Sequence, residues 1–348
     1  DLIEEVGRMY GYDRLPETLP GGISAPGKRS AQEDLVREVR RQLAAQGMYE
    51  VVTNTLTSRS FLSQARLEAS PAWLAGEGEQ AQPVPLRNPI SEEFDTLRPS
   101  LLPGLLQATL HNLRHGTRDV YLFESGYVHS RVGEGLPEYR LMVAGMLFGS
   151  RWSAIWNPEK GGAADFYTAK GIVEALAAGL GLRELTAEPA AYPAFHPGRS
   201  AWLSSGGERI GVVGELHPTH MAMLDVPRGV YAFELDGEFL LRRASDAVRY
   251  VAPSRFPQAL RDLAVVVDHS VPSGGIEGVL REVLGEWARS VRLFDVYAGK
   301  PLPEGKVSLA YALELGAEDR TLTDAEVDAR LDAARARLTV EFGAEFRG

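Results

Sequence analysis

The chain has 348 residues, of which 44% are hydrophobic and 24% charged, so it is long enough for two or three folded domains of ordinary globular composition. It contains no cysteine, which excludes disulfides, thiolate zinc sites and cysteine nucleophiles and fits a reducing cytoplasm. The formal net charge of −10 argues against strong non-specific binding to nucleic acid, and no apolar run approaches the roughly 20 residues of a membrane span, so we expect a cytoplasmic protein without membrane contact.

The first elements in chain order are helices separated by turn-rich segments. Residues 1–10 have a helical composition, and the Pro- and Gly-rich stretch 15–28 predicts a linker. Ser30 and Glu33 form a capping-box pattern that begins a helix ending near Gly47. The following patterns predict a strand at 49–57, a loop at 70–82, a strand at 84–86 and a helix at 100–115.

Strands dominate the middle of the chain. Apolar runs predict them at 121–129, 141–148, 201–204, 209–213 and 230–235, with one helix at 166–180. Because few crossover helices separate these strands, we expect an antiparallel sheet in a mixed α+β module. A polar stretch at 242–252 leads into Pro253, where we predict a domain boundary.

The last ninety or so residues predict the order β-α-β-β-α-β. Their apolar patterns indicate strands at 264–267, 292–297, 307–315 and 344–347, a helix at 272–287, and a second helix that Thr323 caps, with Glu326 completing a capping box. This order is the split βαβ, or ferredoxin-like, motif. Such a fold does not by itself specify a function.

Three short patterns have the residue types of chemical sites, and we interpret all three as structural. They are a near phosphate-binding loop at 22–28, the pair His111 and His115, and the set Glu215, His217 and His220. The loop has Arg29 where the pattern needs Ser or Thr, and the His pair lacks the Glu of a zinc protease motif. Within the third set, Pro218 more simply marks a helix start.

Longer strings resemble one family, the beta subunit of phenylalanine–tRNA ligase. They are RNPISEEFDTLRPSLLPGLLQATLHNLRHG, YLFESGYVH, DFYTAKGIVEALAAGLGL, HPGRSA with GVVGELHP, RDLAVVVD, LFDVYAGKPLPEGKVSLAY and RTLTDAEV. The resemblance implies the end of a preceding domain plus a linker at 1–26, a non-catalytic class II synthetase-like antiparallel-sheet module at 27–251, and a ferredoxin-fold anticodon-binding domain at 254–347.

The resemblance implies a chain that works inside a complex. In that family the alpha subunit binds ATP and charges tRNA(Phe) with phenylalanine, and the intact enzyme is a heterotetramer of two alpha and two beta subunits. Here Phe123 stands where a catalytic relative carries an arginine before an acid, so we expect no catalytic residue and no activity of the isolated chain. We expect the helix at 100–115 and the strand at 121–129 to help build a surface for the alpha subunit.

Two other classes of function remain open on the sequence. A ferredoxin-like domain also suits a ligand-sensing regulatory or dimerisation protein, which would bind no tRNA. A self-sufficient single-chain synthetase is the other alternative, and it would exchange ATP with pyrophosphate unaided.

By motif position, the resemblance assigns RNA contacts to Ala264, Asp295, Tyr297 and Ser308. Asp295 and Tyr297 are two residues apart and therefore project from one face of a strand. A tyrosine offers a plane for base stacking, while Asp and Ser offer hydrogen bonds to base edges. We therefore predict that this strand face reads the anticodon.

The resemblance also implies a Mg²⁺ ion shared with the alpha subunit. In the family its ligands are the Asp and both Glu of DLIEE, here Asp1, Glu4 and Glu5, and a further upstream carboxylate that this sequence does not contain. The three carboxylates share one helix face, where a hard divalent cation would relieve their repulsion.

Overall fold

The structure is a computed structural model, and it describes residues 1–18, 27–68, 81–131, 135–150, 162–182, 185–226, 229–244 and 254–346. The near phosphate-binding loop and most of the predicted linker and 70–82 loop lie outside these ranges. Within them, every helix is too short or too polar to serve as a transmembrane segment.

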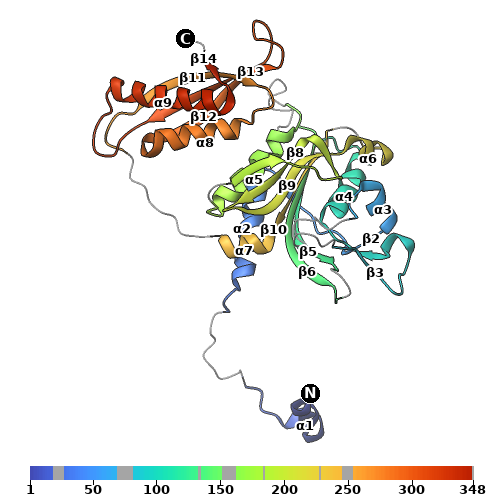
Figure 1. Cartoon of the computed structure of the whole chain (residues 1–348). Helices are drawn as coiled ribbons and strands as arrows, with labels where there is room; N and C mark the ends of the chain where they lie inside the picture. The colour runs from blue at the N-terminus through green and yellow to red at the C-terminus, as the bar shows by residue number, and fades with distance from the viewer. Residues whose placement is uncertain are drawn as a thin grey trace.

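A seven-stranded sheet organises residues 27–244 (Figure 1). Its strands in spatial order are β1 (Tyr49–Glu50), β5 (Val120–Ser130), β6 (Glu138–Phe148), β10 (Tyr231–Asp236), β9 (Glu208–Leu216), β8 (Phe195–Ser205) and β7 (Leu185–Pro189). All neighbours pair antiparallel except β1 with β5. The expected antiparallel α+β architecture is therefore confirmed.

Helices cover both faces of this sheet (Figure 1). One face carries α2 (Ala31–Ala45), α5 (Phe166–Gly179) and α7 (Gly237–Arg243), and the other carries α3 (Arg59–Ala65), α4 (Leu102–Arg114) and α6 (Pro218–Met223). Each face has its own hydrophobic core. The sheet is consequently buried on both sides, which explains why its strands read as continuous apolar runs.

The capping box predicted at the start of α2 is present. The Ser30 hydroxyl accepts from the Glu33 amide at 3.2 Å, and the Glu33 carboxylate accepts from the Ser30 amide at 2.7 Å. The apolar stripe of this helix is buried. Local sequence alone therefore fixes both the start and the buried face of α2.

One prediction about this region is wrong, and a second is narrowed. The strand expected at 49–57 is two short strands, because β1 pairs with β5 while β2 (Leu56–Thr57) joins β4 (Thr96–Leu97) and β3 (Val84–Pro85) in a separate sheet. The surface for the alpha subunit expected at 100–115 and 121–129 stays a prediction, but the leucines of LLPGLL do not contribute to it. Leu101, Leu102, Leu105 and Leu106 are all 0% exposed in the core under α4.

Residues 254–346 form the predicted β-α-β-β-α-β unit. Its elements are β11 (Ala259–Asp268), α8 (Ser273–Leu284), β12 (Ala288–Tyr297), β13 (Lys306–Leu315), α9 (Asp324–Phe342) and β14 (Glu345–Phe346). The strand order is β12-β13-β11-β14, with every pair antiparallel. Both helices pack on the same face, where a third core forms, and they leave the other face of the sheet uncovered (Figure 1).

Candidate functional site

The four residues predicted to contact RNA lie together on the uncovered face of the four-stranded sheet. Ala264 of β11 and Asp295 of β12 both pair with Ala310 of β13, and Ser308 of β13 pairs with Tyr297 of β12. Because paired residues of antiparallel strands project to the same side, the four side chains form two adjacent rows. The structure thus brings together residues that stand 44 positions apart in the sequence.

The strand β13 shows which side of the sheet is open. Leu309 and Tyr311 are buried against α8 and α9, while Ser308 and Ala310 alternate with them and remain partly exposed. At the end of β12, Tyr297 is 45% exposed and its hydroxyl donates to the carbonyl oxygen of Lys300. This bond anchors the ring to the loop that follows the strand.

A β-bulge in β12 determines which residues face outward. Leu293 pairs with Tyr311 and Asp295 pairs with Ala310, so Phe294 is an extra residue without a partner on β13. Simple alternation would place Arg292 and Asp295, three residues apart, on opposite faces. The bulge puts both on the open face.

Sequence reasoning missed Arg292 because it assumed a regular strand. Arg292 pairs with Ala312, which belongs to the same outward series as Ser308 and Ala310, and it is exposed. A signal was available. The apolar residues that pair with the buried Leu313, Tyr311 and Leu309 of β13 stand at 291, 293 and 296, so their spacing changes from two to three at the bulge.

A buried ion pair joins Arg98 to Glu124, the acid that follows Phe123 on β5. Arg98 donates to the Glu124 carboxylate at 2.7 Å, to the Tyr127 carbonyl oxygen at 2.9 Å and to the Thr53 hydroxyl at 3.0 Å. Both charged side chains are nearly inaccessible, at 6% and 3% exposure. Because this guanidinium is buried and binds three groups of the protein, it is not available to a phosphate.

The hydrogen bonds of Arg98 also explain why residue 126 is a glycine. A Cβ added at Gly126 would lie 2.6 Å from a guanidinium nitrogen of Arg98. The ESG sequence of β5 is therefore shaped by the buried pair, because only glycine leaves room for the guanidinium beside Glu124.

A second buried carboxyl supports the start of α4. Glu234 on β10 is 0% exposed and accepts hydrogen bonds from the Leu101 amide at 2.7 Å and from the Ser100 hydroxyl at 2.9 Å. Burial raises the pKa of Glu234 to about 7, although these two hydrogen bonds and the nearby Arg98 oppose the rise. Its role is structural, since it satisfies an amide at the N-terminus of a buried helix.

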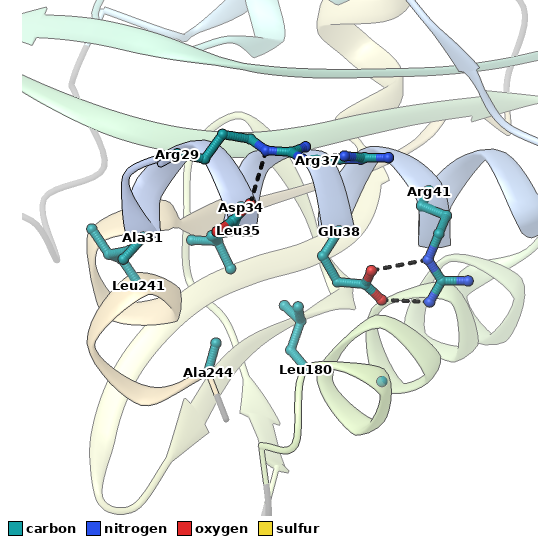
Figure 2. A pocket seen from close by; sticks show the side chains of 11 residues that line it. Arg29, Ala31, Asp34, Leu35, Arg37, Glu38, Arg41, Leu180, Leu241 and Ala244 are labelled. Carbon is teal, nitrogen blue, oxygen red and sulfur yellow. Dashed lines mark hydrogen bonds and ion pairs between the residues drawn. The ribbon is translucent and has the colours of Figure 1, made fainter. Parts of the chain in front are cut away.

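A groove of about 490 Å³ lies between α2, α7 and the end of α5 (Figure 2). Its floor includes Leu35 and Leu180, and arginines of the α2 segment line its rim. Arg41 binds Glu38 at 2.5 Å and Arg29 lies 3.5 Å from Asp34, so carboxylates of the same segment already neutralise two of the arginines. The groove therefore lacks a pair of free arginines for phosphates.

The structure does not assemble a metal site from the carboxylates predicted to bind Mg²⁺. Asp1 precedes α1 (Leu2–Tyr10) as its N-cap residue, and Glu4 and Glu5 lie in the first turn of this helix, which has no buried residues. Glu5 accepts a hydrogen bond from Arg8 at 2.7 Å. Their oxygen chemistry suits Mg²⁺, but in the described part of the chain no group of three or more His, Asp or Glu side chains is placed to hold a metal.

The histidine patterns also have structural explanations. His115 bonds through Nδ1 to the carbonyl oxygen of His111 at 2.7 Å, at the end of α4. Glu215 forms an ion pair with Arg199. The interpretation of Pro218 as a helix start is confirmed by α6.

Comparisons with known proteins match both folded parts. The family model of the phenylalanyl tRNA synthetase beta chain CLM domain matches residues 15–237, and that of the ferredoxin-fold anticodon binding domain matches residues 254–347. Phenylalanine–tRNA ligase beta subunits from Moorella thermoacetica and Geobacillus kaustophilus are each 40% identical over all of this chain. The chain spans 42% of the length of each of these relatives.

Among solved structures, a pyrrolysyl-tRNA synthetase from Desulfitobacterium hafniense matches 64% of this chain and 76% of its own, with a TM-score of 0.45 and 14% sequence identity. That likeness is too low to support an argument about the fold.

Proposed function

The chain belongs to the family of phenylalanine–tRNA ligase beta subunits, and from this premise we propose that residues 254–347 hold the anticodon of tRNA(Phe) while residues 27–251 support the catalytic alpha subunit. In this proposal, the cytoplasmic complex of two alpha and two beta subunits charges the tRNA at the expense of ATP, and this chain supplies no catalytic group. The curated relatives that match the whole chain are beta subunits, which gives the ligand-sensing alternative no support.

The anticodon proposal rests on the two adjacent rows of side chains on the open face of the four-stranded sheet. Tyr297 supplies a stacking plane, and Asp295 and Ser308 next to it supply hydrogen-bonding groups for base edges. A carboxylate repels phosphate, so Asp295 suits a base donor such as the edge of a guanine. Single-stranded RNA is recognised in this way, by stacking combined with edge contacts.

We expect Tyr297→Ala to weaken tRNA(Phe) binding by the reconstituted complex by about 1–3 kcal/mol, which is roughly 5- to 150-fold in Kd, through loss of one stacking contact. Asp295→Ala and Ser308→Ala should mainly relax discrimination among anticodon variants. Filter binding with tRNA(Phe) transcripts measures both effects, and Tyr167→Ala on α5 is the matched control because that tyrosine is also exposed. Normal affinity and normal discrimination in all three variants would remove the proposal.

For the alpha subunit we propose the edge of the seven-stranded sheet at β1 and β5. Four exposed apolar or aromatic side chains lie at or next to this edge: Tyr49 of β1 at 74% exposure, Val52 just after β1 at 85%, Tyr127 of β5 at 37% and Tyr139 of the neighbouring β6 at 70%. The Tyr127 and Tyr139 rings meet edge to face at 5.4 Å, and Arg98 links Tyr127 to Thr53, the neighbour of Val52. Exposed aromatic groups of this kind are typical of interface cores.

We expect Val52→Glu combined with Tyr139→Glu to abolish co-purification with the alpha subunit, because two charges would be buried without partners. Circular dichroism should show an unchanged fold, since both positions are exposed in this chain. The double variant Ile90→Glu with Leu136→Glu, at two other exposed apolar positions, is the control. Equal retention of the alpha subunit by both double variants would exclude this edge.

A further inference from the structure

We propose that RNA on the open face runs along β12 and that its phosphates are held at the two ends of this path, by Arg292 and by Lys300. This inference rests on the proposed function and adds to it a direction for the RNA and two phosphate contacts. Between the two cations lie the rows that contain Asp295 and Tyr297. Base contacts therefore occupy the middle of the path and backbone contacts its ends.

Arg292 lies at one end because of its register. It pairs with Ala312, four residues along β13 from Ser308, the partner of Tyr297. At about 3.4 Å per residue, the Arg292 row is therefore about 14 Å from the Tyr297 row. Arg292 is exposed, and it forms no ion pair or hydrogen bond through its side chain with any described residue.

Lys300 lies at the other end, in the loop after β12. The hydroxyl of Tyr297 donates to its carbonyl oxygen, so the backbone of Lys300 is tied to the ring proposed to stack on a base. The side chain of Lys300 is exposed and, within the described ranges, has no carboxylate partner. A phosphate next to the stacked base would come within reach of this ammonium group.

The charge pattern of this part of the chain makes these two cations distinctive. Residues 254–347 contain 12 Lys and Arg against 16 Asp and Glu, a net charge of −4. Most of the described cations already bind carboxylates: Arg261 with Asp324, Arg289 with Glu318, Lys306 with Glu345, Arg320 with Glu326, Arg335 with Asp332, and Arg337 with Glu341.

The other cations of this part of the chain are less suited to bind phosphate on the open face. Arg281 and Arg330 donate to backbone carbonyl oxygens, and Arg255 precedes β11, outside the paired strands. By register, five carboxylates share the open face: Asp262 opposite Ala312, Glu314 at the next row, Asp268 opposite Lys306, Glu345 opposite Val266, and Asp295. Four of these carboxylates lie on β11, β13 and β14, where they repel phosphate, whereas β12 carries only Asp295. The backbone of the RNA is therefore expected along β12.

The test is the salt dependence of tRNA(Phe) binding by the complex with the alpha subunit. The logarithm of the association constant falls with the logarithm of the salt concentration, and each lost phosphate contact to single-stranded RNA makes this slope less steep by about 0.7. We expect Arg292→Gln and Lys300→Gln each to lower the slope by about that amount, and the double variant by about twice as much. Discrimination among anticodon variants should stay unchanged, because phosphate contacts carry no base information.

The control is Arg335→Gln, which removes the same charge from α9, on the helical side of the sheet. A slope unchanged in Arg292→Gln and Lys300→Gln, together with weaker binding in Tyr297→Ala, would overturn the path but leave the anticodon proposal standing. An equal slope change in Arg335→Gln would also overturn it, since only overall charge would then matter. If Tyr297→Ala and both cation variants bind normally, the face does not hold RNA and both proposals fail.

Discussion

At the scale of single residues, the buried carboxyl of Glu234 makes stability depend on pH. Burial raises its pKa to about 7 in the folded chain, whereas an unfolded chain has the ordinary value of 4.5. Between these values the folded state binds more protons than the unfolded state, so the free energy of unfolding falls as pH rises from about 4.5 to about 7. Above pH 7 this contribution is constant.

We expect Glu234→Gln to remove this fall in the free energy of unfolding, because glutamine does not titrate. Its neutral amide keeps one oxygen for the Leu101 amide and one donor for the Ser100 hydroxyl. The gain in unfolding free energy relative to the parent chain should be near zero at pH 4.5 and on the order of 3 kcal/mol at pH 8. Urea unfolding across this range measures it. Glu92→Gln, at an exposed carboxylate, should show no such divergence, and parallel curves for Glu234→Gln and the parent would contradict the assignment.

Residue-scale prediction from sequence worked where a side chain had a local or motif-based role. The placement of Asp295 and Tyr297 on one strand face is confirmed by the register. The partners of Glu124 and Glu234 were not predictable, since Arg98 and Ser100 are 26 and 134 residues away from them in the sequence. A buried acid in an apolar strand predicts that a hydrogen-bond or ion-pair partner exists, but the sequence does not show which residue it is.

At the scale of elements, α9 begins with a full capping box. The Thr323 hydroxyl accepts from the Glu326 amide at 3.4 Å, and the Glu326 carboxylate accepts from the Thr323 amide at 2.9 Å and from Arg320 at 2.8 Å. Hydrogen bonds from Arg320 and Thr323 lower the pKa of Glu326 to about 2. The cap is therefore charged and intact at neutral pH.

We expect Thr323→Ala to destabilise residues 254–346 by about 1 kcal/mol, the usual cost of losing an N-cap hydroxyl, while Thr323→Ser should be nearly neutral. Thermal unfolding followed by circular dichroism measures both. Thr321→Ala, an exposed threonine two residues earlier outside the helix, controls for the loss of a threonine as such. If Thr323→Ala and Thr321→Ala are indistinguishable, the cap does not stabilise the helix.

Both capping boxes and the order β-α-β-β-α-β were predictable, because each depends on short-range patterns. The short helices α3 and α7 were missed. Each has seven residues, too few for an apolar period to stand out. The division of 49–57 into β1 and β2 was equally hidden, because it depends on pairing with β5 and β4, which no local pattern specifies.

At the scale of the whole molecule, residues 254–346 have a core of their own. That cluster contains only residues from 263 to 344, and the two clusters of the larger sheet contain only residues from 35 to 240. A boundary near Pro253 stays a prediction, and the separate cores support it.

We expect the segment 254–347 expressed alone to fold in one cooperative transition and to keep the tRNA contacts attributed to its open face. The whole chain should then unfold in two transitions, one of which matches the isolated segment. Differential scanning calorimetry of both chains measures this. An isolated segment without a transition, or a single transition in the whole chain that Thr323→Ala shifts as a unit, would show that the two parts fold together.

The bulge at Phe294 also bears on self-association. β12 is an edge strand, and its outer side leaves backbone groups unpaired next to Phe294 and Val296, which are 52% and 57% exposed. A long, flat, apolar edge invites another chain to add a strand and begin an aggregate. The extra residue interrupts the regular ladder and increases the local twist, which disfavours in-register pairing with a second copy. The irregularity that turns Arg292 outward thus also keeps this sheet from growing.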